Sequence, residues 1–173
     1  MLLRIDELNA LRSDIERYRS DKDKLIEIMG DWLLLAYADG KNDVEDQLHG
    51  EAEVSIDRIH EVMNKVVGGK TVIERIGDDL DSIEDIYLLF GNERQRVYNT
   101  AANDTAENLG AKFKTWRTME DERVRDTHFY LENMTKPMNE PFYTYDGDSA
   151  MYPQAFGNAA NNINCRCWLT YNK

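Results

Sequence analysis

Residues 121–128 read Asp-Glu-Arg-Val-Arg-Asp-Thr-His, and residues 164–167 read Asn-Cys-Arg-Cys. Around these two motifs stand Trp116, the segment Asn139-Glu-Pro-Phe142 and the pair Tyr152-Pro153. Helix and strand propensities alone do not explain this ordered mixture of aromatic, charged and cysteine residues. The residues that decide the fold and the function are therefore expected in the last part of the chain.

The acidity of the chain belongs to its first half. The chain has 173 residues, enough for one domain with a helical extension, and a net charge of −12. Residues 1–90 hold 22 Asp/Glu against 11 Lys/Arg, whereas residues 91–173 hold 11 against 10. Acidic surfaces repel the phosphates of nucleic acids, which disfavours a stand-alone nucleic-acid binder. We interpret the acidity as a solvated helical surface.

Other bulk features exclude several classes of protein. The longest apolar stretch, Trp32–Ala38, is far shorter than the ~20 residues that cross a bilayer, so it predicts a buried helix segment and no membrane partner. The N-terminus lacks the basic and apolar regions of a signal peptide. The two cysteines are one residue apart and make no disulfide framework. These features predict a cytoplasmic origin.

The first half of the chain predicts helices. Its apolar residues recur at steps of three and four, which is the period of an amphipathic helix. The expected helices cover residues 2–19, a run from Ser20-Asp21 to Asp39-Gly40, residues 43–67 up to Gly68-Gly69, and, less cleanly, residues 71–90. Glycines at 40, 68 and 91 are interpreted as helix breaks.

The second half predicts a mixed module. We expect a helix over residues 93–109, a strand over 111–117, a short helix from about residue 119 to about residue 132, and a last strand over Cys165–Tyr171. The remainder predicts loops with short strands. The fold class is therefore α+β, with an acidic helical region at 1–90 and, at 91–173, a small module of a few antiparallel strands and a loop-rich C-terminus.

Asp121, Arg125 and His128 share one face of the expected short helix, because they are spaced four and three residues apart. Thr118 and Asp121 have the spacing of a capping box. In one interpretation an Asp121–Arg125 ion pair fixes the helix against the strand of Trp116, with His128 as a satisfied polar contact. In the other, Arg125 and His128 face a phosphate or a labile bond, with His128 as acid or base.

Cys165 and Cys167 allow two interpretations. On a strand both thiols project from the same face, and a disulfide between such close neighbours would be strained. The thiols are then either small buried apolar groups or two ligands of a zinc ion. His128 would be the third zinc ligand, and Asp121 is a poor candidate for the fourth.

The ordered set resembles the phage Mu F-like head morphogenesis family, the minor capsid proteins of tailed bacteriophages. The resemblance covers about residues 90–170. It rests on Trp116, the Asp121–His128 motif, Asn139–Phe142, Tyr152-Pro153 and Asn164–Cys167, with Arg94 or Arg96 and Asn99 upstream. The chain departs from the family in its shorter N-terminal region and in Leu131–Lys136, where the family has a glycine-containing turn.

The resemblance implies a low-copy structural protein of the virion, assembled in the host bacterial cytoplasm. The implied partners are the phage portal or other head proteins, with packaged DNA as a further contact, and no enzymatic activity or cofactor is expected. Two alternatives stay open: a phage-encoded nuclease or toxin-like enzyme that uses Arg125 and His128, and a zinc-stabilised adaptor. The residues expected to form the motif scaffold are Trp116, Asp121, Arg125, His128, Phe142, Asn164, Cys165 and Cys167.

Overall fold

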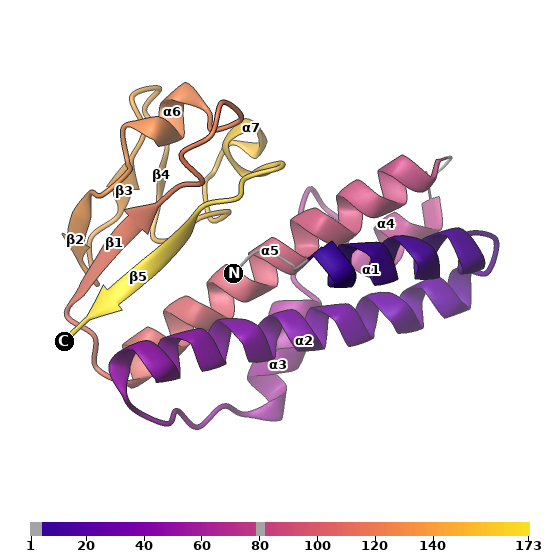
Figure 1. Cartoon of the computed structure of the whole chain (residues 1–173), viewed down its shortest axis with the longest axis horizontal. Coiled ribbons are helices and arrows are strands. Elements are labelled where there is room, and N and C mark those ends of the chain that lie inside the picture. Colours follow the sequence, from indigo (N-terminus) through magenta and orange to yellow (C-terminus); the bar gives the residue numbers. More distant parts are fainter. Residues whose placement is uncertain (1–4, 79–81) are drawn as a thin grey trace.

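The computed structural model describes residues 5–78 and 82–173, and its fold is α+β as predicted. The helical part contains α1 (Ile5–Tyr18), α2 (Lys22–Leu48), α3 (Ile56–Met63), α4 (Val72–Asp78) and α5 (Ile83–Asn108). The strand layer contains β1 (Phe113–Arg117), α6 (Asp126–Phe129), β2 (Thr135–Pro137), β3 (Phe142–Tyr143), β4 (Ser149–Ala150), α7 (Ala159–Asn162) and β5 (Trp168–Asn172). The long helices α2 and α5 lie side by side, and the strand layer packs beside the C-terminal half of α5 (Figure 1).

Side-chain caps fix the starts of the long helices. The Asp21 carboxylate accepts a hydrogen bond from the backbone N–H of Lys24 at 3.0 Å at the start of α2. The Ser82 hydroxyl does the same for Asp85 at 3.0 Å before α5. Such caps satisfy backbone donors that a helix cannot satisfy itself. No helix in the described residues is long and apolar enough to span a bilayer.

The predicted break at Gly40 is wrong, because α2 continues through this residue to Leu48. A Cβ atom at position 40 would lie 2.3 Å from the backbone oxygen of Tyr98 in α5. The backbones of α2 and α5 therefore approach closely at Gly40, and the contact favours glycine inside the helix. The break predicted at Gly91 is also wrong, since α5 runs through it.

The helix predicted over residues 43–67 is two helices. The first part belongs to α2, which ends where His49 adopts a left-handed backbone with φ 52°. A connection follows, and α3 begins after Ser55, whose hydroxyl accepts from the N–H of Arg58 at 3.1 Å. The apolar period continues across the connection and hides this change of direction.

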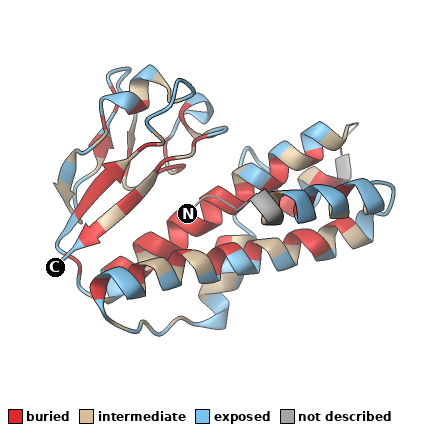
Figure 2. Ribbon diagram, in the orientation of Figure 1, coloured by how far each residue is buried: buried red, intermediate tan, exposed pale blue. Residues whose placement is uncertain are grey.

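Helix α5 serves both hydrophobic cores of the molecule. Its N-terminal and middle turns contribute Phe90 and Val97 to the core of the helical part, and its last turns contribute Ala102 and Ala106 to the core of the strand layer. Buried positions run along most of α5 and through β1 (Figure 2). The boundary drawn from the sequence at residues 90/91 therefore falls inside this shared helix.

The strands form two small antiparallel sheets. The larger has the order β2-β1-β5, with Trp116 paired to Leu169, and the smaller pairs β3 with β4. The strand predicted at 111–117 is observed as β1. The last strand begins at Trp168, so Cys165 and Cys167 lie in the segment that leads into it.

The short helix predicted over residues 119–132 is reduced to α6. Residues 118–124 form turns, because side chains bond the local backbone there: the Asp121 carboxylate accepts from the N–H of Arg123 at 3.1 Å, and the Thr118 hydroxyl accepts from that of Glu120 at 3.2 Å. Such local bonds compete with helix formation. The capping-box prediction at Thr118 is therefore wrong.

Candidate functional site

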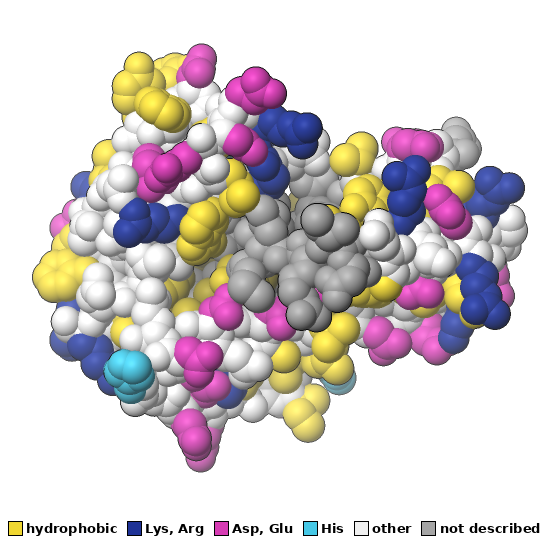
Figure 3. Space-filling model, viewed as in Figure 1, with side chains coloured by type: hydrophobic (Ala, Val, Ile, Leu, Met, Phe, Trp, Pro, Cys, Tyr) yellow, Lys and Arg dark blue, Asp and Glu magenta, His cyan; other side chains and the backbone are white. Residues whose placement is uncertain are grey.

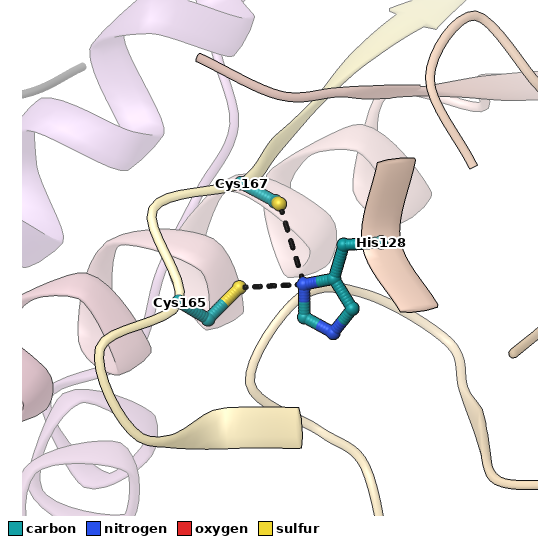
Figure 4. Close-up of side chains that lie close together, drawn as sticks. All are labelled: His128, Cys165 and Cys167. Atoms are coloured by element: carbon teal, nitrogen blue, oxygen red, sulfur yellow. Dashed lines mark hydrogen bonds between the residues drawn. The ribbon is translucent and has the colours of Figure 1, made fainter. Parts of the chain in front are cut away.

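His128, Cys165 and Cys167 converge in the interior of the strand layer (Figure 4). The imidazole Nδ1 lies 3.6 Å from the Sγ atom of Cys165 and 3.6 Å from that of Cys167. The exposed fractions of the three residues are 1%, 3% and 4%. Both cysteines are free thiols. The structure thus brings together the three residues that the sequence offered as zinc ligands.

Short local elements place these side chains. His128 stands on α6, whose backbone bonds run from the N–H of His128 to the oxygen of Arg125 at 2.9 Å and from the N–H of Leu131 to the oxygen of His128 at 3.0 Å. The cysteine segment is held by α5. The side-chain amides of Gln95 and Asn99 donate to the Cys167 oxygen at 3.1 and 3.2 Å.

The upstream motif residues Arg94, Arg96 and Asn99 each have a different partner. Asn99 binds the cysteine segment directly, as described above. Arg94 forms an ion pair with Asp39 of α2 at 2.9 Å, whereas Arg96 pairs with Glu93 within α5 at 2.8 Å. Arg94 ties α5 to α2, and Asn99 holds the cysteine segment against α5.

Aromatic rings enclose the imidazole. Trp116 meets the His128 ring edge-on at 5.7 Å between centroids, and it meets Phe142 at 5.0 Å. Phe156 stacks on the imidazole at 5.2 Å. Phe156 was not predicted as a site residue from the sequence, because it stands alone in a loop where no spacing pattern marks it. Its neighbours show that the motif aromatics form the core of this layer.

The two thiols and the imidazole interact electrostatically and shift the pKa values of the thiols. The hydrogen bond from Cys167, helped by His128, lowers the pKa of the Cys165 thiol well below its usual value. The pKa of Cys167 is raised, first by its hydrogen bond to Cys165 and then by burial, while the nearby Arg125 acts in the opposite direction. The pair therefore favours one thiolate beside one thiol.

The predicted pair between Asp121 and Arg125 is wrong. Asp121 instead forms a two-pronged ion pair with Arg166, with N–O distances of 2.6 and 2.7 Å. This hydrogen bond is the main cause that lowers the pKa of Asp121. The guanidinium of Arg125 donates to the backbone oxygen of Ile163. Asp121 therefore forms its ion pair with Arg166 and is not the fourth member of the His–Cys cluster.

Asn164 fixes the turn before the cysteines. Its backbone is left-handed, with φ 57°, a conformation that asparagine tolerates better than most residues. Its N–H donates to the side-chain oxygen of Asn92 in α5 at 2.5 Å, and the Asn92 amide donates back to its side-chain oxygen at 3.3 Å. The motif asparagine therefore ties this turn to the shared helix.

The space beside the cluster is small. A cavity of about 10 Å³ is lined by Met119, Arg123, Val124, Arg125, His128, Asn164, Cys165, Arg166 and Cys167. This volume is close to the room that a single water needs. Two larger clefts, of about 600 and 630 Å³, are lined by neither His128 nor the cysteines. A substrate the size of a nucleotide does not fit against this imidazole.

Comparison with known proteins gives two matches. The family described as Phage Mu protein F like protein matches residues 57–170. The NAD(+)–arginine ADP-ribosyltransferase EFV of Enterococcus faecalis is 35% identical over 74 residues, which are 42% of this chain and 15% of that enzyme. The chain thus spans a small part of this curated relative. No solved structure matches the chain.

The family match covers more than half of the chain and includes every motif residue from Arg94 to Cys167. It also ends within β5, so it takes in the shared helix α5 and nearly all of the strand layer. We conclude that the chain belongs to the Phage Mu protein F like family and is a phage head-related protein.

Proposed function

We propose that the protein is a minor head protein that acts without enzymatic activity in head morphogenesis at the portal vertex and is a component of the virion. One observation carries this proposal. The family match contains motif residues that are core residues here, since Trp116, His128, Phe142, Cys165 and Cys167 are all buried. Residues that build a scaffold support a structural role better than a catalytic one.

The exposed surface supports contacts with other head proteins. Hydrophobic side chains project at the end of the molecule that carries α6 (Figure 3). There Tyr130 lies between Phe129 and Tyr145, with ring centroids 6.4 and 5.8 Å apart, and all three side chains are mostly exposed. Exposed aromatic rings of this kind are enriched at protein interfaces.

Contact with packaged DNA is the less favoured part of the proposal, because a net charge of −12 repels phosphates.

The test is deletion of the gene from its phage, followed by complementation. We expect the deletion to lower the yield of normal heads, and the restored protein to co-purify with portal complexes and with finished particles. Electron microscopy counts the heads, and immunoblots of purified particles and procapsids follow the protein. Its absence from both kinds of particle would refute the proposed role.

A surface variant then asks where the partner binds. Tyr130→Ser with Tyr145→Ser removes two rings of the exposed aromatic group, and Phe113→Ser removes a half-exposed ring at the start of β1 as the matched control. We expect the first variant to keep its thermal stability but to lose co-purification with portal complexes. The control should retain it. Equal co-purification of both variants would assign the contact to another surface.

The nuclease alternative makes a different prediction. It needs Arg125 and His128 to reach a phosphodiester, but His128 is buried and its cavity holds about 10 Å³. The match to the ADP-ribosyltransferase covers only 15% of that enzyme, too little to bring its activity to this chain. Incubation with labelled RNA and DNA decides the matter. Cleavage that disappears in a folded His128→Ala variant would replace the structural role with an enzymatic one.

A further inference from the structure

The His128–Cys165–Cys167 cluster has the composition of a metal site. The three ligand atoms all lie within 4.8 Å of one another, and no other such group of three occurs in the described ranges 5–78 and 82–173. All three residues are buried, so their ligand atoms face one another with little competition from solvent (Figure 4). Two thiolates with one imidazole suit zinc among the common divalent ions, since harder ions prefer oxygen ligands.

The distances fit a tetrahedral ion at the centre of the cluster. Bonds of ~2.3 Å to sulfur and ~2.1 Å to nitrogen, at a tetrahedral angle, place sulfur and nitrogen about 3.6 Å apart. The two observed distances from Nδ1 of His128 to the sulfurs of Cys165 and Cys167 are both 3.6 Å. A neutral imidazole offers a single lone pair on this nitrogen, so it can accept only one S–H bond well. Equal distances to both sulfurs are explained better by one shared ion.

The surroundings fit an ion with two negative ligands. Arg123, Arg125 and Arg166 line the adjoining cavity and offset the charge of thiolates. The Nε2 atom of His128 is buried without a hydrogen-bond partner. When Nδ1 of a neutral imidazole binds a metal, the proton of the ring is on Nε2.

We propose that His128, Cys165 and Cys167 bind one zinc ion, with a water molecule in the adjoining cavity as the fourth ligand. The ion joins α6 to the segment before β5, two parts of the chain that are 37 residues apart at His128 and Cys165. Its role is to hold together the loops of the strand layer and so to stabilise this part of the fold. This proposal is independent of the proposed role in head assembly.

The first experiment measures metal in the full-length protein. The protein is made without a metal-binding tag, purified without added metal, exposed to zinc, and freed of loose ions by gel filtration. Elemental analysis is expected to give about one zinc per chain, falling to about a tenth or less in Cys165→Ser with Cys167→Ser. His49→Gln and His60→Gln change the two exposed histidines outside the cluster and should keep the metal. Folded wild-type protein without zinc, or a folded double variant that retains it, would overturn the proposal.

The second experiment needs no variant, so it holds even if the cysteine variants fail to fold. Cobalt(II) in place of zinc is expected to give thiolate-to-metal charge-transfer absorption and the intense visible bands of a tetrahedral ion. X-ray absorption of the zinc form should then find two sulfurs and two lighter atoms around the metal. Removal by a chelator should lower the melting temperature, and zinc should restore it. A metal shell with no sulfur, or one with four sulfurs, would contradict the assigned ligands.

Discussion

Lys114 is a charged side chain in the core of the strand layer. Its ammonium donates to the backbone oxygens of Met138 at 2.9 Å and Met151 at 2.8 Å, and it lies 5.6 Å from the centre of the Phe142 ring. Burial lowers the pKa of Lys114 to about 8. The neutral amine keeps enough protons to donate to both oxygens, so the loss of charge breaks neither bond.

This pKa predicts how stability depends on pH. An unfolded lysine has a pKa of ~10.4, so between pH 8 and pH 10 the unfolded chain binds more protons, and the free energy of unfolding rises with pH. Relative to Lys114→Met, the wild type should gain about 2 kcal/mol between pH 7 and pH 10. Urea unfolding at a series of pH values measures the difference. Parallel pH curves for the two proteins would show that Lys114 titrates normally.

The partner of Asp121 can be tested by double-mutant cycles. Asp121→Asn with Arg166→Gln should show a favourable coupling in the free energy of unfolding, because the two side chains form a two-pronged ion pair. The matched cycle of Asp121→Asn with Arg125→Gln should show a smaller coupling, since Arg125 binds a backbone oxygen. Salt should weaken the first coupling. A larger coupling with Arg125 would restore the pairing expected from sequence.

At the level of single residues the sequence predicted which side chains matter better than it predicted their partners. The approach of His128 to both cysteines was anticipated as one alternative. The pairing of Asp121 was not, because its carboxylate bonds the backbone of Arg123 and turns the chain before a helix forms. Which arginine then lies nearby depends on the path of residues far along the chain, and no local spacing records that path.

Among the elements, α2 contains two glycines with opposite surroundings. A Cβ at Gly40 would lie 2.3 Å from a backbone oxygen of α5, whereas a Cβ at Gly30 would meet nothing within 4 Å. Gly40→Ala should cost about 2 kcal/mol or more, because two backbones must move apart. Gly30→Ala should gain about 0.5–1 kcal/mol from helix propensity. Chemical denaturation of both variants measures the contrast, and equal effects would show that α2 and α5 do not approach at Gly40.

The same glycines explain why the helix ends were mispredicted. Apolar periodicity gave the helical character of the first half correctly. The cost of a glycine inside a helix is only about 1 kcal/mol, and packing between long helices outweighs it at Gly40. Conversely, α2 ends at His49, which adopts a left-handed backbone without being the glycine or asparagine that usually marks a helix end. Propensity marks a helix, but its ends depend on neighbouring elements.

For the whole molecule, the shared helix makes the two predicted regions depend on each other. A fragment of residues 91–173 would begin inside α5 and lose the helices that cover its buried face. We expect this fragment to give a poorly dispersed NMR spectrum and to aggregate, whereas the full chain gives a dispersed one. Sharp, dispersed signals from the isolated fragment would establish residues 91–173 as an independent domain.

The contact between β5 and α2 has a consequence for folding during translation. The N–H of Tyr171 donates to the Gln47 side chain in α2 at 2.8 Å, so a contact across 124 positions closes the molecule. A ribosome makes the helices α1 to α5 before it makes this strand. The helical part can become compact during translation. The sheet, however, cannot form completely until residue 172 has left the exit tunnel of the ribosome. Nascent chains stalled before that point should remain open to protease in residues 111–163.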